Sequence, residues 1–178
     1  MRFRELALHG VWLVEPEPVG DRRGAFWRTF CEHEMALHGL ETRFVQHSQS
    51  HSRRAGTLRG MHFQAAPHAE TKLVSCVRGA IHDVVVDLRP ASETYRRWVA
   101  AELSEANRRA LYIPKGCAHG FMTLQPDAVV NYLISEWYEP TAATGIRYDD
   151  PAIGIEWPGQ PTEISDRDLA WTLLGEMA

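Results

Sequence analysis

A histidine, a lysine and an arginine stand close together in a stretch that otherwise has the pattern of a sheet. Residues 58–64 read Leu-Arg-Gly-Met-His-Phe-Gln, and Lys72 opens the next apolar run. Successive side chains of a strand face opposite sides, so His62 and Gln64 are expected on one face and their apolar neighbours on the other. Such a histidine can exchange protons near neutral pH. A buried histidine is also commonly no more than a hydrogen-bonded core residue.

A second histidine follows a proline–glycine turn. The segment Pro114-x-Gly116-x-x-His119 is similar to the second half of the cupin signature, in which the histidine points into the mouth of a barrel. A metal-binding cupin also needs a His-x-His pair and a later glutamate, but His62 is followed by phenylalanine and glutamine. Two imidazoles are fewer than the three protein ligands usual at catalytic zinc. The sequence therefore favours a site without metal or cofactor, with a metal-dependent cupin as a lesser alternative.

The remaining candidates are groups for acid–base chemistry. His62 is the default base, Lys72 can stabilise an oxyanion, and Tyr132 can exchange a proton on the other face of a substrate. A carboxylate behind the histidine would fix its tautomer, and Asp166 and Asp168 lie in the late polar segment. Together such groups suit proton abstraction next to a carbonyl. Each also has a plainer interpretation as a core, surface or capping residue, and spacing alone does not decide between them.

The elements that must position these residues are strands. Apolar runs punctuated by glycine and proline predict strands within residues 5–15, 25–30, 44–46, 58–64, 73–76, 80–88, 95–103, 110–113, 118–124 and 129–135. A helix is expected over residues 31–39, ending at Gly39. The polar residues 47–56 are interpreted as a strand end and loop, and residues 146–171 as irregular. Short strands with little helix predict an all-β sandwich or barrel.

Composition narrows the class of protein. The length suits one domain over residues 1–178, and the net charge of -4 argues against non-specific nucleic-acid binding. No run approaches the roughly 18 apolar residues of a membrane span, and the first residues do not resemble a signal peptide. Cys31, Cys76 and Cys117 are scattered and odd in number, as is typical of reduced thiols. We therefore expect a cytoplasmic protein with neither a nucleic-acid nor a membrane partner.

Taken together, the motifs resemble those of the dTDP-4-dehydrorhamnose 3,5-epimerase family. The resemblance runs in order from about residue 8 to about residue 169, and it is carried by Asp21-x-Arg23-Gly24-x-Phe26, Phe44-Val45-Gln46, residues 58–64, Lys72-Leu73-Val74, Arg78-Gly79, residues 83–89, residues 113–121, Tyr132, Tyr138-x-Pro140, Asp149-Asp150-Pro151, Ile155-x-Trp157-Pro158 and Ser165-Asp166-x-Asp168. It implies a metal-free cupin-type double-stranded β-helix, or jelly roll, with short peripheral helices, and a homodimer. The implied substrate is a nucleoside-diphosphate 4-keto-6-deoxy sugar. The implied pathway leads to a deoxysugar for polysaccharide, as in dTDP-rhamnose biosynthesis.

The same resemblance implies a role for each candidate residue. His62 would be the general base and Asp168 its carboxylate partner. Lys72 would stabilise the enolate at the 4-keto oxygen, and Tyr132 would be the acid on the opposite face. The implied substrate-binding residues are His119 in the sugar pocket, Arg23 and Arg59 on the diphosphate, and Phe26, Gln46 and Tyr138 around the nucleoside and its linkage.

Two positions depart from the family pattern. Arg28 stands where the family usually has an acidic residue, and His47-Ser48 stands where it usually has Asp-Asn. Both are expected near the nucleotide or the sugar, so Arg28 and Ser48 join the candidate substrate-binding residues, and CDP- and GDP-linked sugars are alternatives to a dTDP sugar. A mono-epimerase and a 3,4-ketoisomerase are alternatives on the same scaffold. A non-catalytic sugar-nucleotide-binding cupin is the alternative from another class, but pure binding would not need the proton-transfer residues.

Overall fold

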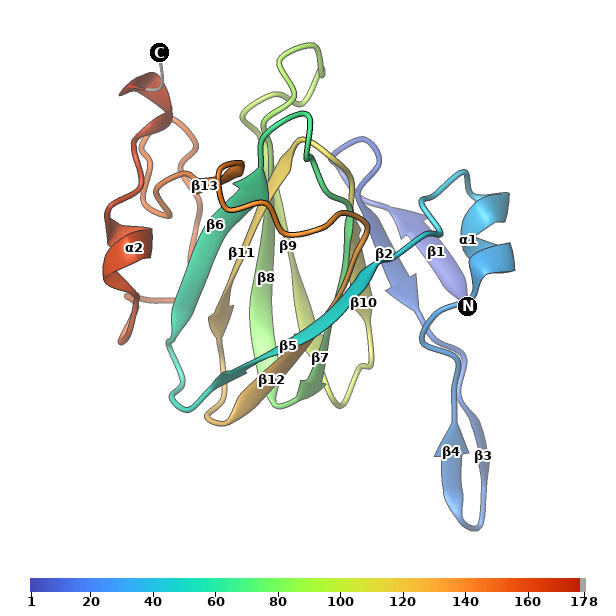
Figure 1. The fold of residues 1–178 in the computed structure, drawn as a ribbon. Coiled ribbons are helices and arrows are strands. Elements are labelled where there is room, and N and C mark those ends of the chain that lie inside the picture. The colour runs from blue at the N-terminus through green and yellow to red at the C-terminus, as the bar shows by residue number, and fades with distance from the viewer. Residues whose placement is uncertain (177–178) are drawn as a thin grey trace.

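Two antiparallel sheets form the body of the protein (Figure 1). The computed structural model describes residues 1–176. The strands are β1 (Arg2–Glu5), β2 (Trp12–Glu15), β3 (Val19–Asp21), β4 (Gly24–Phe26), β5 (Gln46–Ser52), β6 (Leu58–Gln64), β7 (Lys72–Arg78), β8 (Ala80–Asp87), β9 (Trp98–Ser104), β10 (Ala110–Ile113), β11 (Cys117–Thr123), β12 (Ala128–Ile134) and β13 (Ala143–Gly145). The helices are α1 (Glu32–Leu37), α2 (Asp166–Leu169) and the 3-10 turn η1 (Leu174–Glu176).

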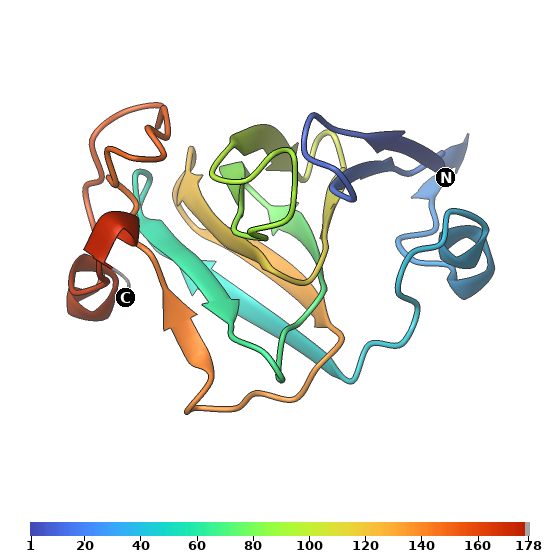
Figure 2. The same ribbon diagram turned by 90° about the horizontal axis from the view of Figure 1, so that it is seen from above.

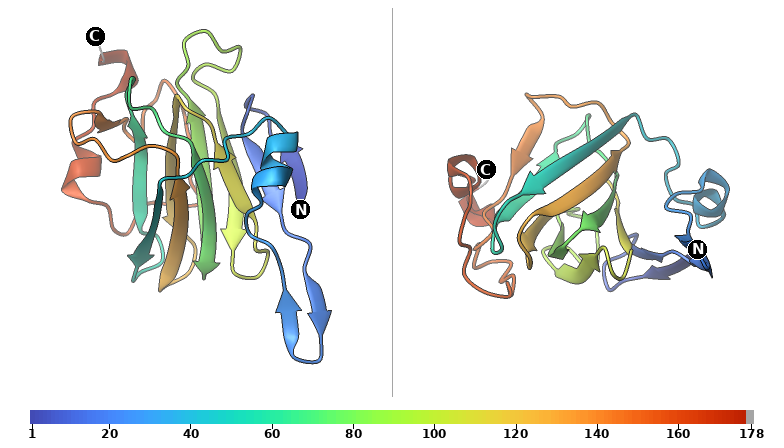
Figure 3. Two further views of the ribbon diagram at one scale, coloured as in Figure 1. Left: turned by 45° about the vertical axis from the view of Figure 1, so that its right-hand side comes forward. Right: turned by 90° about the horizontal axis from the view of Figure 1, so that it is seen from below.

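The strand order within the sheets is that of a jelly roll. One sheet has the order β1-β2-β10-β7-β12-β5 and the other β13-β6-β11-β8-β9, so strands far apart in sequence become neighbours. Viewed from above and below, the sheets face each other around a common interior (Figures 2 and 3). The cupin-type jelly roll with short peripheral helices is therefore confirmed. Among residues 1–176, no helix has the length and apolar character needed to cross a membrane.

Alternation along the strands divides the apolar residues among three clusters. The interior between the sheets holds side chains such as Val74, Val85, Leu111 and Phe121. Outside the five-stranded sheet, the C-terminal segment covers Met61, Val84, Val86 and Ala118. Outside the six-stranded sheet, Met35 of α1 packs on Val14, Leu73 and Tyr112. Full burial of one such side chain contributes about 1.5–3 kcal/mol, so these clusters fix the strands that carry the polar residues.

Residues 47–56 are interpreted from the sequence as a strand end and loop, but the strand continues as far as Ser52, so the loop begins later than expected. β5 runs from Gln46 to Ser52 and pairs with β12 along its whole length. Its polar character has a structural cause, because β5 is the edge strand of its sheet and few of its side chains are buried. On one face, His47 and Gln49 contact Asn131, at 2.7 and 3.3 Å. A strand whose two faces are both polar lacks the alternation from which strands are predicted.

The segments outside the sheets differ in how well the sequence predicted them. The helix expected over residues 31–39 is confirmed in its centre as α1, and Gly39 follows it with a φ of 68°. The segment expected to be irregular contains α2, which Ser165 caps by accepting a hydrogen bond from the backbone of Asp168. The β3–β4 hairpin projects away from the sheets (Figures 1 and 3).

Candidate active site

His62 and Asp168 form a hydrogen-bonded pair. The distance from His62 Nε2 to Asp168 Oδ1 is 2.6 Å, and the aspartate side chain is 5% exposed against 42% for the histidine. The backbone N–H of Gly60 donates to Asp168 Oδ2 at 3.1 Å, and the indole N–H of Trp171 donates to Oδ1 at 3.2 Å. Burial raises the pKa of Asp168, but these donors outweigh it, with His62 the strongest, and hold the pKa below its usual value. The carboxylate is therefore ionised and fixed behind an accessible imidazole.

The C-terminal segment returns to β6 to deliver Asp168. The backbone of Glu163 accepts a hydrogen bond from the N–H of Leu58 at 2.8 Å, and α2 begins shortly afterwards. Gly60 is required where the aspartate meets the sheet, because its φ is 134° and an added Cβ would lie 2.5 Å from Gly120 Cα on β11. The dyad thus depends on two glycines that let β6 and β11 approach closely.

Lys72 lies beside the dyad on the opposite sheet. Its ammonium nitrogen is 3.4 Å from the carbonyl oxygen of His62 and 3.0 Å from Glu70 Oε1. The side chains of this ion pair are only 10% and 11% exposed. A buried charge is normally paired, and Glu70 is the counter-ion that stabilises the Lys72 ammonium inside the barrel.

A second histidine–carboxylate pair lies deeper in the interior. His119 Nε2 is 2.6 Å from Asp83 Oδ1, and Asp83 is fully buried. His119 is directly opposite His62 in the pairing of β11 with β6. Its ring packs edge-on against Tyr132, with ring centroids 6.2 Å apart. The two imidazoles and the phenol therefore face the same interior between the two sheets.

Tyr132 faces this interior from β12. Its hydroxyl is 3.0 Å from Ser50 Oγ on β5. Burial raises the pKa of Tyr132, and the hydrogen bond to Ser50 offsets that effect only in part. The phenol is therefore protonated throughout the neutral range and can donate a proton.

Basic and polar residues line the approach to the dyad. A cleft of about 500 Å³ is lined by Arg59 and Asp168 together with His51, Ser52, Arg53, Thr57, Leu58, Glu163, Ile164 and Ser165. The Arg59 guanidinium donates to Ser52 Oγ at 3.1 Å and to the carbonyl of His51 at 3.0 Å. Arg53 and Arg59 give this cleft groups that can bind an anionic ligand, provided that the ligand keeps its distance from the carboxylates of Glu163 and Asp168.

Two further predicted residues lie near one exposed loop. Gln46 donates to the carbonyl of Glu136 at 2.6 Å, two residues before Tyr138, which is 58% exposed. Gln64 is buried and donates to the carbonyl of Trp137 at 3.1 Å, so it also holds this loop. Ser48 is exposed on β5 between Gln46 and Ser50.

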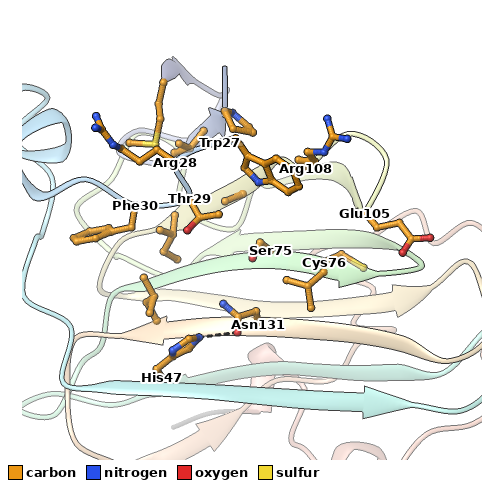
Figure 4. A pocket seen from close by; sticks show the side chains of 17 residues that line it. Trp27, Arg28, Thr29, Phe30, His47, Ser75, Cys76, Glu105, Arg108 and Asn131 are labelled. Atoms are coloured by element: carbon orange, nitrogen blue, oxygen red, sulfur yellow. Dashed lines mark hydrogen bonds between the residues drawn. The ribbon is translucent and has the colours of Figure 1, made fainter. Parts of the chain in front are cut away.

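Three predicted substrate-binding residues are not brought to this cluster within one chain. Arg23 pairs with Asp21 at 2.6 Å on the projecting hairpin, and Phe26 is 79% exposed there. Arg28 pairs with Glu34 at 2.6 Å. Arg28 lines a separate pocket on the outer face of the six-stranded sheet, together with Trp27, Phe30 and His47 (Figure 4).

Sequence reasoning missed several residues that complete the cluster. Asp83 had a usable signal, because alternation along β8 puts it on the same face as Ile81 and Val85. Glu70, Ser50 and Trp171 are polar or aromatic residues in ordinary surroundings, and no local pattern marks them. Among residues 1–176, no group of three or more His, Cys, Asp or Glu side chains could hold a metal ion.

The arrangement has the parts needed to move a proton at a carbon next to a carbonyl. A carboxylate-backed imidazole, a buried ammonium and a neutral phenol border the same interior. The first can accept a proton, the second can stabilise the resulting oxyanion, and the third can return a proton.

Comparison with known proteins supports the resemblance over nearly the whole chain. The profile of the dTDP-4-dehydrorhamnose 3,5-epimerase family matches residues 5–176. The dTDP-4-dehydrorhamnose 3,5-epimerase of Methanothermobacter thermautotrophicus is 46% identical over 178 residues, covering 98% of this chain and 95% of the relative. A dTDP-4-dehydrorhamnose 3-epimerase of Streptomyces niveus is 40% identical, covering 99% and 85%.

A solved structure agrees closely with the fold. The dTDP-6-deoxy-D-glucose-3,5-epimerase of Legionella pneumophila, in complex with dTDP-4-keto-L-rhamnose, superposes with a TM-score of 0.93 at 37% identity. The match covers 99% of this chain and 94% of that one. The likeness therefore includes the strands that carry the dyad, the lysine and the tyrosine.

Proposed function

The chain belongs to the dTDP-4-dehydrorhamnose 3,5-epimerase family, and we propose that His62, Lys72, Tyr132 and Asp168 are the residues that carry out its reaction. The protein is an isomerase that acts on a dTDP-4-keto-6-deoxy sugar. We propose inversion at both C3 and C5, the two carbons that flank the 4-keto group. The observation that carries this assignment is the 2.6 Å contact between His62 and the buried Asp168, next to Lys72.

In the proposed mechanism, His62 removes the proton from the carbon next to the carbonyl. The electron pair of the broken C–H bond forms the enolate double bond, and the carbonyl oxygen becomes the oxyanion. Asp168 stabilises the imidazolium that forms and holds the ring in one tautomer. Lys72 donates to the oxyanion, and its ammonium is already desolvated beside Glu70.

Inversion requires the new proton to arrive from the opposite face of the sugar. Tyr132 supports this role because it lies on the sheet opposite His62, and its phenol is neutral and hydrogen-bonded to Ser50 on the neighbouring strand β5. When the enolate collapses, its carbon takes the phenol proton and the carbonyl is restored. Because C3 and C5 both flank the same carbonyl, one set of residues can serve both centres in turn.

Solvent exchange tests the proposed chemistry. The enzyme is incubated with dTDP-4-keto-6-deoxyglucose in heavy water, and the sugar protons are followed by NMR. We expect deuterium at C3 and at C5, because each carbon takes its new proton from the Tyr132 hydroxyl, and hydroxyl protons exchange with heavy water. No exchange at either carbon by folded enzyme would contradict the assignment and would direct the search to CDP- and GDP-linked sugars.

A mono-epimerase is the second candidate, and the similarity to the dTDP-4-dehydrorhamnose 3-epimerase of Streptomyces niveus supports it. The same heavy-water experiment separates the two. Deuterium at only one carbon would identify a mono-epimerase, and migration of the keto group would identify a 3,4-ketoisomerase. All three reactions use the same base and enolate, so this outcome would leave the roles of His62 and Lys72 standing.

We infer that the protein is a homodimer in which the hairpin serves the other copy. Val19 and Phe26 on the hairpin are 73% and 79% exposed, which is unusual for such large apolar side chains. A pocket of about 350 Å³ also opens on the outer face of the six-stranded sheet, with apolar lining from Trp27, Phe30 and Leu133 (Figure 4). A second copy covering this face would bury both features, and Arg23 and Phe26 could then reach its nucleotide.

Mixing two defective variants tests this arrangement. Arg23→Ala and His62→Ala are purified separately, then denatured and refolded together. If Arg23 acts on the partner's site, a mixed dimer has one intact site, and about a quarter of all sites recover at random pairing. Each variant refolded alone is the control. No gain in activity on mixing, with dimers present, would show that Arg23 does not act across the interface.

The compartment that we propose is the cytoplasm. Cys31, Cys76 and Cys117 are all free thiols, which is usual for proteins of a reducing compartment. There the enzyme would supply a deoxysugar pathway such as that of dTDP-rhamnose, for a surface polysaccharide.

A further inference from the structure

Trp171 makes a hydrogen bond to the carboxylate of the dyad that the proposed mechanism does not use. Its indole N–H donates to Asp168 Oδ1 at 3.2 Å, the same oxygen that lies 2.6 Å from His62 Nε2. The indole and imidazole rings meet edge-on, with centroids 6.3 Å apart at 71°. Trp171 therefore contacts both members of the pair.

The indole is seated between two other elements. On one side is Gly145 of β13, where an added Cβ would lie 2.6–2.7 Å from two atoms of the indole. Gly145 is paired with His62 in the β13–β6 ladder, so the missing side chain opens a slot beside the base itself. On the other side, the Arg167 guanidinium lies 5.1 Å from the centre of the indole ring.

We propose that Trp171 is a positioning residue of the epimerase, which holds the Asp168 carboxylate against His62 and sets the basicity of the pair. This inference rests on the proposed function of the dyad. It assigns Trp171 no contact with the substrate. The seat formed by Gly145 and Arg167 fixes the ring, and the ring fixes the carboxylate oxygen.

The direction of the effect follows from the hydrogen bond. An N–H donor withdraws part of the negative charge from Asp168, and the bond from Trp171 is one of the contributions that lower the pKa of this carboxyl. Without it, more charge is left to stabilise a protonated imidazole. The active, neutral form of the base would then be reached only at higher pH, so the acid limb of the activity profile should move upward.

Other charged groups face the dyad and must stay constant in a test. The Lys72–Glu70 ion pair approaches the dyad from β7. The His119–Asp83 pair lies on β11 and β8, next to β6. Arg59 precedes the dyad on β6, and Arg167 covers the indole. Replacing Trp171 alters none of these charged residues, which are Arg59, Glu70, Lys72, Asp83, His119 and Arg167.

Trp171→Phe removes the donor and keeps a ring in the slot. We expect kcat/KM to fall roughly threefold to tenfold at pH 6 and less at pH 8, because one hydrogen bond to a charged group is lost. The control is Trp157→Phe, which also removes an indole N–H. That N–H donates to the carbonyl of Tyr148, at 2.9 Å, and makes no contact with Asp168. Its profile should keep the wild-type acid limb. An unmoved acid limb in Trp171→Phe, at any level of activity, would overturn the proposal.

A second measurement needs neither substrate nor turnover. The indole N–H signals of the uniformly ¹⁵N-labelled protein are followed by NMR between about pH 5 and pH 9, with Trp171→Phe used for assignment. The Trp171 signal should shift over this pH range through the carboxylate that it shares with His62, and the shift should disappear in His62→Asn. A Trp171 signal that does not depend on His62 would overturn the proposal, even if the enzyme proved to act on another sugar. Failure of the heavy-water experiment alone would instead count against the proposed function.

Discussion

His62→Ala is expected to lower kcat by about three orders of magnitude, roughly 4 kcal/mol of transition-state stabilisation. The variant loses the imidazole that is hydrogen-bonded to Asp168, and no neighbouring group replaces it. His119 is the nearest alternative, but it is 5% exposed and committed to Asp83. The measurement is kcat on a dTDP-4-keto-6-deoxy sugar, together with the affinity for dTDP.

The affinity for dTDP separates loss of chemistry from loss of folding. It should change little in His62→Ala, because the proposed nucleotide contacts lie on other residues. His33→Ala is a suitable control, since His33 is exposed on α1. A His62→Ala enzyme that kept activity within about tenfold would show that the histidine contributes less than ~1.4 kcal/mol and is not the base.

The position of His62 itself was predictable from local alternation. The pattern of residues 58–64 put Met61 and Phe63 on the face opposite His62, and the structure packs both against the outer apolar cluster. Period-two alternation is a local property, so it survives in the sequence. A register shift beside Gly60 was not visible, because it arises from the close approach of β11.

The partner of the base could not be found in the same way. Asp168 is 106 residues from His62, and their contact depends on the pairing of β6 and the return of the chain at Glu163. No spacing rule links residues that far apart. Only the resemblance implied the pair. Trp171 has no counterpart among the family motifs, and only the fold brings its indole to the carboxylate.

The hairpin illustrates a different limit. The resemblance implied Arg23 and Phe26 as substrate-binding residues, yet within one chain they lie on a hairpin that projects away from the two sheets (Figure 1). A motif records that residues act together and does not record whether they belong to the same copy. The symmetry of the proposed dimer would supply that information, which is why the mixing experiment is informative.

Lys72→Met is expected to lower kcat by about two to three orders of magnitude, the usual effect of losing one group that stabilises an oxyanion. Lysine is rare in this chain. Of its 19 lysines and arginines, only Lys72 and Lys115 are lysines. Lys72 is 8% exposed, whereas Lys115 lies in an exposed turn. Lysines are mostly found on surfaces, so a buried one among so many arginines indicates a requirement for a compact ammonium.

Lys115→Met is the matched control and should retain wild-type kcat. Lys72→Arg tests the shape of the charge, because a guanidinium is planar and larger than the ammonium paired with Glu70. If the charge at the 4-keto oxygen matters, deuterium uptake in heavy water should slow in Lys72→Met in parallel with kcat, since both depend on the enolate. Uptake that stayed fast while inversion failed would contradict this role, because the enolate would then form without Lys72.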